Sequence, residues 1–320
     1  MDLHLLVDNL TNPALMFFGL GLVASQVKSD LEIPKNSSKF ISLYLLLAIG
    51  FKGGQELAHS TFSSDILFAL LAGIILAIAV PFYTFYVLRL RFSVENAGAI
   101  AAAYGSVSAV TFVTAVSFLE LEGIEFGGHM VAVMAMMEAP SIIIGVLLMR
   151  VYSNGKKSTK ELLGLLKHAI TNGSVLLILG SLLIGFIASD AQAEGIKPFT
   201  TDIFKGFLAV FLLDMGITSG QEIGALVKKG WFALSFAIVV PILNGVFVSI
   251  ASGLFLTEFG DRFLLSILAA SASYIAVPAA MRIAAPKANP SLYLPMALAI
   301  TFPFNITLGM PIYMFIIQNF

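Results

Sequence analysis

The chain has 320 residues, of which 58% are hydrophobic and only 12% charged, and its mean hydropathy is +0.94. Soluble domains carry roughly 25% charged residues, so this chain has too little polar surface to cover a water-soluble body. Its surplus apolar surface must face lipid. The sequence contains no cysteine, which excludes disulfides and thiolate metal sites. A net charge of -1 gives no reason to expect a nucleic-acid partner.

Ten apolar segments are long enough to predict membrane spans, because a span needs roughly 17–25 mostly apolar residues. Residues 1–10 contain Asp2 and Asp8 and no Lys or Arg, unlike a cleaved signal peptide, so the first segment is expected to remain as a span. The expected spans are 13–27, 38–52, 66–90, 97–118, 128–152, 174–189, 203–218, 231–256, 263–285 and 292–318.

Four sequence elements recur in the same order in both halves of the chain. The pairs are TNPALMFFGLG from Thr11 with TNGSVLLILGS from Thr171 (displaced by 160), AIGFKGGQELA from Ala48 with DMGITSGQEIG from Asp214 (166), AAAYGSVSA from Ala101 with SASYIAVPA from Ser271 (170), and Pro140 and Gly145 with Pro303 and Gly309. Each half holds five spans, an odd number, so the second half must enter the membrane from the opposite side. We therefore expect two inverted five-helix repeats, 1–152 and 171–320, joined by a cytoplasmic linker at 153–170.

The distribution of basic residues predicts the orientation, because cytoplasmic loops are enriched in Lys and Arg. With both termini outside, 14 of the 18 basic residues fall on the inner side: Lys28, Lys35, Lys39, Arg89, Arg91, Arg150, Lys156, Lys157, Lys160, Lys167, Lys228, Lys229, Arg282 and Lys287. The outer side keeps Lys52, Lys197, Lys205 and Arg262. This excess also supports an even number of spans.

Small and polar residues in the middle of the fourth and ninth spans predict two broken helices that cross at the midplane. Gly105 and the neighbouring serines weaken the first, and Pro278 removes a backbone donor from the second. A break at this depth is tolerated around a cavity, where helix N-termini can hold an anion and carbonyl ends or hydroxyls can hold sodium. The alternative is that small residues only allow close helix packing. The expected anion-site residues are Tyr104, Gly105, Ser106, Val107, Ser108, Thr111, Ser271, Ser273, Tyr274 and Ala276.

Glu138 is the main candidate for binding sodium. It lies inside the apolar segment VAVMAMMEAPSIIIGVLL, where a carboxylate costs at least roughly 2.5–3.5 kcal/mol unless it is paired or hydrated. Its counterpart in the second half is Thr301, with Asn305 one turn later, and Ser108 lies in the first break. Asp214 is a further candidate. Structural pairing is the alternative reading for both carboxylates.

Several motifs that would indicate other chemistry are missing from the sequence. The four histidines lie near loops without metal-ligand spacing, and no nucleotide-binding or hydrolase motif occurs. Glu56 and Glu222, in the twin GQE motifs, are expected at opposite membrane surfaces, in capping or gating. We expect a transporter driven by an ion gradient, and not an enzyme.

The runs YGSVSAVTFVTAVSFLELEG, MEAPSIIIGVLL and AASASYIAVPAAMRIAAPKANPSLYLPMALAITFPFNITLGMPIY resemble the bacterial sodium-dependent bicarbonate transporter family, as does FKGGQEL. The resemblance covers nearly the whole chain. It implies a core and a gate domain similar to those of bile-acid symporters and sodium/proton antiporters, and inward sodium/bicarbonate symport across the inner membrane. It also implies a homotrimer and a small PII-like regulator on the inner face. The second break departs from the family pattern by having Tyr274 and fewer hydroxyls.

Three alternatives to bicarbonate symport remain open. A symporter of the same fold could carry another small anion, such as an organic acid. A proton antiporter would need paired carboxylates at the breaks, which the sequence does not show. A protein of another class, a membrane sensor, could bind an anion without moving it.

Overall fold

The computed structural model describes residues 7, 9–60, 63–152, 171, 173–227 and 230–320, and the predicted linker at 153–170 lies outside them. These residues form helices and no strand. The first half contains α2 (Pro13–Gln26), α3 (Lys35–His59), α4 (Ser64–Leu88), α5 (Val94–Gly105), α6 (Ala109–Glu122) and α7 (His129–Tyr152). The second half contains α9 (Gly173–Ile187), α10 (Asp190–Lys197), α11 (Phe204–Val227), α12 (Trp231–Ala251), α13 (Phe259–Ala270), α14 (Ala276–Ala284), α15 (Pro290–Pro295), α16 (Phe302–Phe304) and α17 (Met310–Asn319).

Each predicted apolar segment is helical, but fewer of them are long and apolar enough to cross a membrane. Within the described part of the chain, six helical stretches meet both requirements: Ser64–Leu88, Val94–Glu122, His129–Tyr152, Asp190–Gly224, Trp231–Leu254 and Pro290–Asn319. The helices Pro13–Gln26 and Gly173–Ile187 are apolar and shorter. The all-helical membrane class is therefore confirmed, while the count of ten spans remains a prediction.

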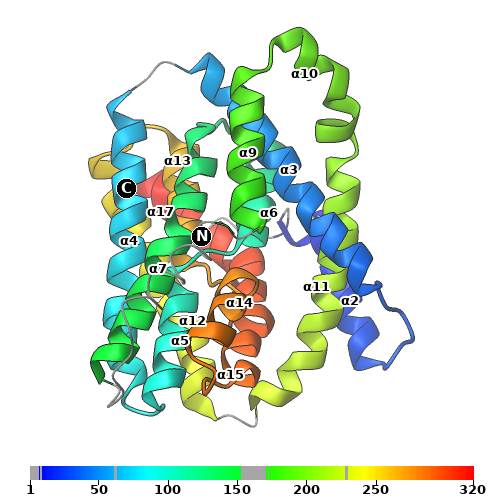
Figure 1. The fold of residues 1–320 in the computed structure, drawn as a ribbon. Coiled ribbons are helices and arrows are strands. Elements are labelled where there is room, and N and C mark those ends of the chain that lie inside the picture. Colours follow the sequence, from blue (N-terminus) through cyan, green and yellow to red (C-terminus); the bar gives the residue numbers. More distant parts are fainter. Residues whose placement is uncertain (1–6, 8, 61–62, 153–170, 172, 228–229) are drawn as a thin grey trace.

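Two bundles lie side by side in the molecule (Figure 1). In the smaller one, α2 packs against α11 and α3 against α9. In the larger one, α4 packs against α5 and α7, and α12 packs against α13 and α17. The apolar side chains on the outside of both bundles suit a lipid environment.

Glycines allow the helices of the smaller bundle to touch along their backbones. A Cβ at Gly216 of α11 would collide with the Phe18 carbonyl of α2, and one at Gly54 of α3 would collide with the Leu182 carbonyl of α9. Such close backbone approach is typical of helix pairs in membranes, where packing replaces the hydrophobic effect.

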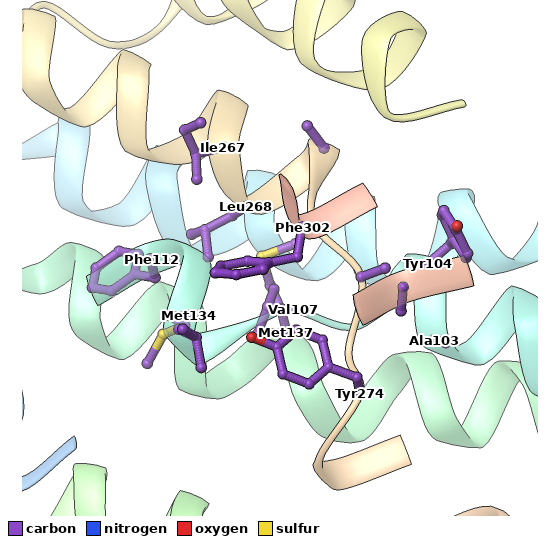
Figure 2. Close-up of a cluster of buried hydrophobic side chains, with 14 of the residues drawn as sticks. Ala103, Tyr104, Val107, Phe112, Met134, Met137, Ile267, Leu268, Tyr274 and Phe302 are labelled. Atoms are coloured by element: carbon purple, nitrogen blue, oxygen red, sulfur yellow. The ribbon is translucent and has the colours of Figure 1, made fainter. Parts of the chain in front are cut away.

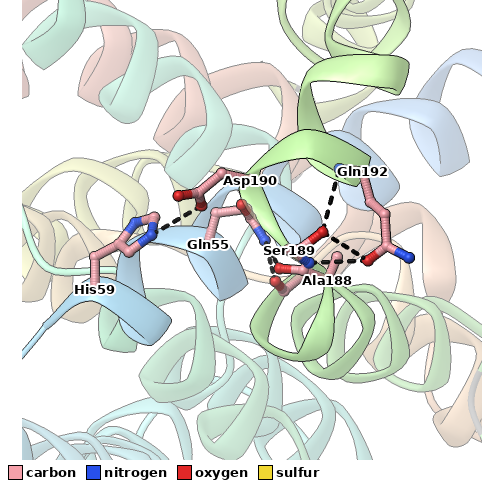
Figure 3. A network of polar contacts seen from close by, with 7 residues as sticks. Gln55, His59, Ala188, Ser189, Asp190 and Gln192 are labelled. Atoms are coloured by element: carbon pink, nitrogen blue, oxygen red, sulfur yellow. Dashed lines mark hydrogen bonds and ion pairs between the residues drawn. The ribbon is translucent and has the colours of Figure 1, made fainter.

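Polar side chains also join α3 to α9 at one end of the smaller bundle (Figure 3). The Gln55 amide donates to the carbonyl oxygens of Gly185 and Ala188, the latter at 2.9 Å. His59 Nε2 lies 3.0 Å from Asp190 Oδ1. Carbonyls at the end of a helix lack intrahelical donors, so the glutamine of the first GQE motif caps α9.

The final span is irregular. Between α15 and α17 the chain forms two π-helical stretches, Met296–Thr301 and Asn305–Gly309, on either side of α16. Pro295, Pro303 and Pro311 interrupt the hydrogen-bond ladder in this region, because each lacks a backbone N–H. The widened turns place Thr301 and Asn305 towards neighbouring helices.

Candidate functional site

Both predicted breaks are present in the structure. The first separates α5 from α6 at Ser106–Ser108, and the second separates α13 from α14 at Ser271–Ile275. Two hydrogen bonds tie them together: Ser273 N donates to Ala103 O at 2.8 Å, and Ser108 N donates to Ser271 Oγ at 3.1 Å. The extended segments therefore cross, and each provides hydrogen-bond partners for backbone groups of the other.

The crossing leaves two helix N-termini beside one cavity. Ser108 is the N-cap of α6, and its Oγ accepts from Thr111 N at 3.1 Å. Ala109 and Val110 of the same turn line the cavity, as does Ala276 at the start of α14. First-turn N–H groups have no intrahelical acceptor and carry the positive end of the helix dipole. Both termini thus direct partial positive charge to this place.

The cavity is narrow, with a volume of about 20 Å³, which leaves room for about one water molecule. Of the residues predicted for the sites, six line it: Val107, Ser108, Glu138, Ser273, Tyr274 and Ala276. Sequence reasoning missed the opposite wall, which comes from the smaller bundle: Ser42, Leu45, Leu46, Ser174 and Phe211. No described lining residue is a Lys or Arg. Hydroxyls and backbone N–H groups are consequently the donors available to an anion here.

Glu138 places a carboxylate in the same cavity. The side chain comes from the middle of α7, and the residue is 8% exposed. A buried carboxylate beside an anion is electrostatically unfavourable unless a cation or proton neutralises it. The described residues include no cluster of three or more acidic or histidine side chains suited to a metal. Sodium would therefore have to use Glu138 with hydroxyl and carbonyl oxygens.

Three hydroxyls at the crossing are buried without a hydrogen-bond partner among the described residues: Ser106 Oγ, Thr111 Oγ1 and Tyr274 Oη. The Tyr274 ring packs in the apolar layer of the crossing (Figure 2), with its centroid 5.9 Å from that of Phe302. Its hydroxyl lies near Ser108 without reaching hydrogen-bond geometry. Burying such groups unpaired is costly. Of the three, only Tyr274 also lines the central cavity, so its hydroxyl is the one available to a polar ligand there.

Four further predicted residues instead stabilise the crossing. Tyr104 Oη lies 2.8 Å from Thr301 Oγ1, which donates to Ala237 O at 2.7 Å. Asn305 Nδ2 donates to Ala270 O at 2.8 Å. Gly105 lies against Pro81, where a Cβ would have no room. Thr301 and Asn305 are thus engaged with protein atoms, and Glu138 is better placed than either to meet a cation.

Asp214 lies away from the crossing. It accepts a hydrogen bond from Ser38 Oγ and lines a separate vestibule with a volume of about 590 Å³. This vestibule also carries Lys35 and Lys39, which the charge distribution predicts on the inner side, so we call it the inner vestibule; it lies at the end of the α2–α3 connection. It shares five lining residues with the central cavity: Ser42, Ser174, Phe211, Tyr274 and Ile275. The crossing is therefore continuous with this end of the molecule.

A comparison with known families identifies a match over residues 13–318, nearly the whole chain, to the family described as the Na⁺-dependent bicarbonate transporter superfamily. This match confirms the resemblance found in the sequence. No functionally curated protein matches the chain.

Proposed function

The chain belongs to the Na⁺-dependent bicarbonate transporter superfamily, and from this premise we propose that it is a secondary active transporter that couples sodium entry to bicarbonate uptake. A multi-pass helical membrane protein of a transporter family fits this activity. The observation that carries the proposal is the composition of the central cavity: two helix N-termini and several hydroxyls beside one carboxylate. The N-termini attract an anion, and the carboxylate repels it until a cation is present.

This arrangement supplies a physical reason for coupling. An anion held by N–H groups near Glu138 experiences a repulsion, which sodium at the carboxylate removes. Each ion therefore improves binding of the other, and by linkage the effect is reciprocal. We propose that the hydroxyls of Ser108, Ser273 and Tyr274 bind the anion and that Glu138 binds sodium. If the roles were exchanged, with the anion at Glu138 and sodium at the hydroxyls, the Glu138 carboxylate would face a ligand of the same charge.

Paired helix contacts support the proposed inverted repeats. Gly21 of α2 meets Gly216 of α11, and Gly50 of α3 meets Ser181 of α9. These two contacts are equivalent under the repeat. At a displacement of 160, position 21 corresponds to position 181, and at a displacement of 166, position 50 corresponds to position 216. The contact of Gly54 with Gly185 likewise becomes that of Gly220 with Ser25. In Figure 1, α2 and α9 end at opposite ends of the bundle.

The orientation is also part of the proposal. The α4–α5 and α14–α15 connections and the ends of α2 and α7 lie at one end of the molecule, with α10 at the other (Figure 1). Among the described residues that were predicted to be inner, Arg89, Arg150 and Lys287 lie at or next to the first end. The positive-inside rule supports both termini outside, and the family resemblance supports an inner-membrane location. A homotrimer and a PII-like regulator are supported by the family resemblance alone.

Uptake of labelled bicarbonate into proteoliposomes tests the function. A sodium gradient should raise uptake above the level in sodium-free buffer, and a potassium gradient should not. Sodium-driven uptake of a different small carboxylate, without bicarbonate competition, would favour the organic-acid symporter. Saturable bicarbonate binding without uptake would favour the sensor.

A further inference from the structure

An ion pair connects the two bundles at the end of the molecule opposite the inner vestibule. The Lys52 ammonium of α3 pairs with a carboxylate oxygen of Glu120 in α6. The side chains are 28% and 24% exposed, so water screens the pair only in part. Lys52 also lies 6.0 Å from the centroid of the Phe204 ring in α11. Lys52 therefore belongs to the smaller bundle, and its side chain reaches α6, which packs against α13 of the larger bundle.

This pair lies in a second vestibule, which we call the outer vestibule, with a volume of about 450 Å³. The central cavity shares no described lining residue with that vestibule, although it shares five with the inner one. Ile49 of α3 and Val116 of α6 line the outer vestibule and are each only 3% exposed. One turn earlier on the same helices, Leu45 and Val113 line the central cavity. Packing of α3 on α6 thus closes the crossing on the outer side.

We propose that Lys52 and Glu120 form the outer gate and hold the protein in the state that opens to the inner vestibule. The inference rests on the proposed transport function, since a transporter must expose its site to each side in turn. Opening outwards requires α3 and α6 to separate, which breaks the pair. The pair therefore stabilises one of the two states and shifts the population towards it.

The internal repeat indicates that closure on the inner side has no such pair. At the displacements found in the sequence, the counterpart of Lys52 is Thr218 and that of Glu120 is Pro290. Neither is charged, so at this pair of positions the opposite arrangement exchanges an ion pair for two neutral side chains. Because only the outer side has this ion pair, the outer-closed state is favoured.

A reporter cysteine measures the bias directly, because the natural chain has no cysteine. In Ile275→Cys, at a position that is 44% exposed and lines both the central cavity and the inner vestibule, a membrane-impermeant thiol reagent should react from the inner face and slowly from the outer face. Adding Lys52→Met should raise the outer rate about fivefold and lower the inner rate, as expected for loss of a partly exposed pair. Glu120→Gln should act in the same direction more weakly. It removes a carboxylate, whereas Lys52→Met leaves the Glu120 carboxylate without its cation.

The charge-swapped double variant, Lys52→Glu with Glu120→Lys, should return the outer rate towards that of the parent. Lys197→Met is the matched control, since Lys197 pairs with Glu194 within α10, at 3.2 Å, and does not join the two bundles. Unchanged rates in Lys52→Met, or equal rises from both faces, would overturn the gate. The labelling needs no substrate, so it remains informative if bicarbonate uptake fails.

Discussion

Replacing Ser108 is the sharpest test of the crossing as the anion site. Its Oγ accepts from Thr111 N at 3.1 Å and its side chain lines the central cavity. Ser108→Ala removes this cap and one hydroxyl donor without adding volume. Loss of one hydrogen bond from the hydroxyl to the anion costs about 1 kcal/mol, which corresponds to about fivefold in an equilibrium constant. Bicarbonate uptake should therefore weaken about fivefold and persist.

Ser108→Leu adds bulk at the point where both helix N-termini meet the cavity. It should abolish uptake, because the added carbons occupy the anion's place. Ser106 is less informative, since its fully buried side chain does not line the cavity and a leucine there would disturb packing. The control is Thr114→Leu, on the same helix and outside the cavity lining. Normal sodium-driven uptake by a well-folded Ser108→Leu protein would refute anion binding at the crossing.

Three other predictions concern sodium, packing and orientation. Glu138→Gln should raise the sodium concentration for half-maximal uptake about tenfold, which corresponds to a loss of roughly 1.4 kcal/mol in sodium binding. Unchanged sodium activation would leave Glu138 only a structural role. Gly216→Ala should lower the thermal unfolding temperature because its Cβ meets the Phe18 carbonyl, whereas Gly19→Ala, with open space around it, should not; equal effects would contradict the packing argument. In intact cells, an impermeant thiol reagent should label Ala191→Cys and spare Ser29→Cys, and the opposite result would reverse the orientation.

Some of this protein could be predicted from local chemistry. The length of each apolar segment, the charge asymmetry between loops and the Gly, Ser and Pro residues in two of the segments depend on neighbouring residues only. They sufficed to place the helices, and they located the breaks within a few residues of Ser108 and Tyr274. The mid-span position of Glu138 distinguished it in the same way, because a carboxylate is rare and costly inside an apolar segment.

The tertiary structure decided which of the predicted residues share one cavity. Thr301 and Asn305 have the right oxygens for sodium, but neither lines the central cavity, and each donates a hydrogen bond to a carbonyl that is distant in sequence. Ser42 and Ser174 face the crossing only because α3 and α9 pack beside it, and Lys52 meets Glu120 only across the boundary of two bundles. These hydrogen-bond partners and cavity walls come from helices that are far apart in the chain, and no periodicity within one helix encodes them.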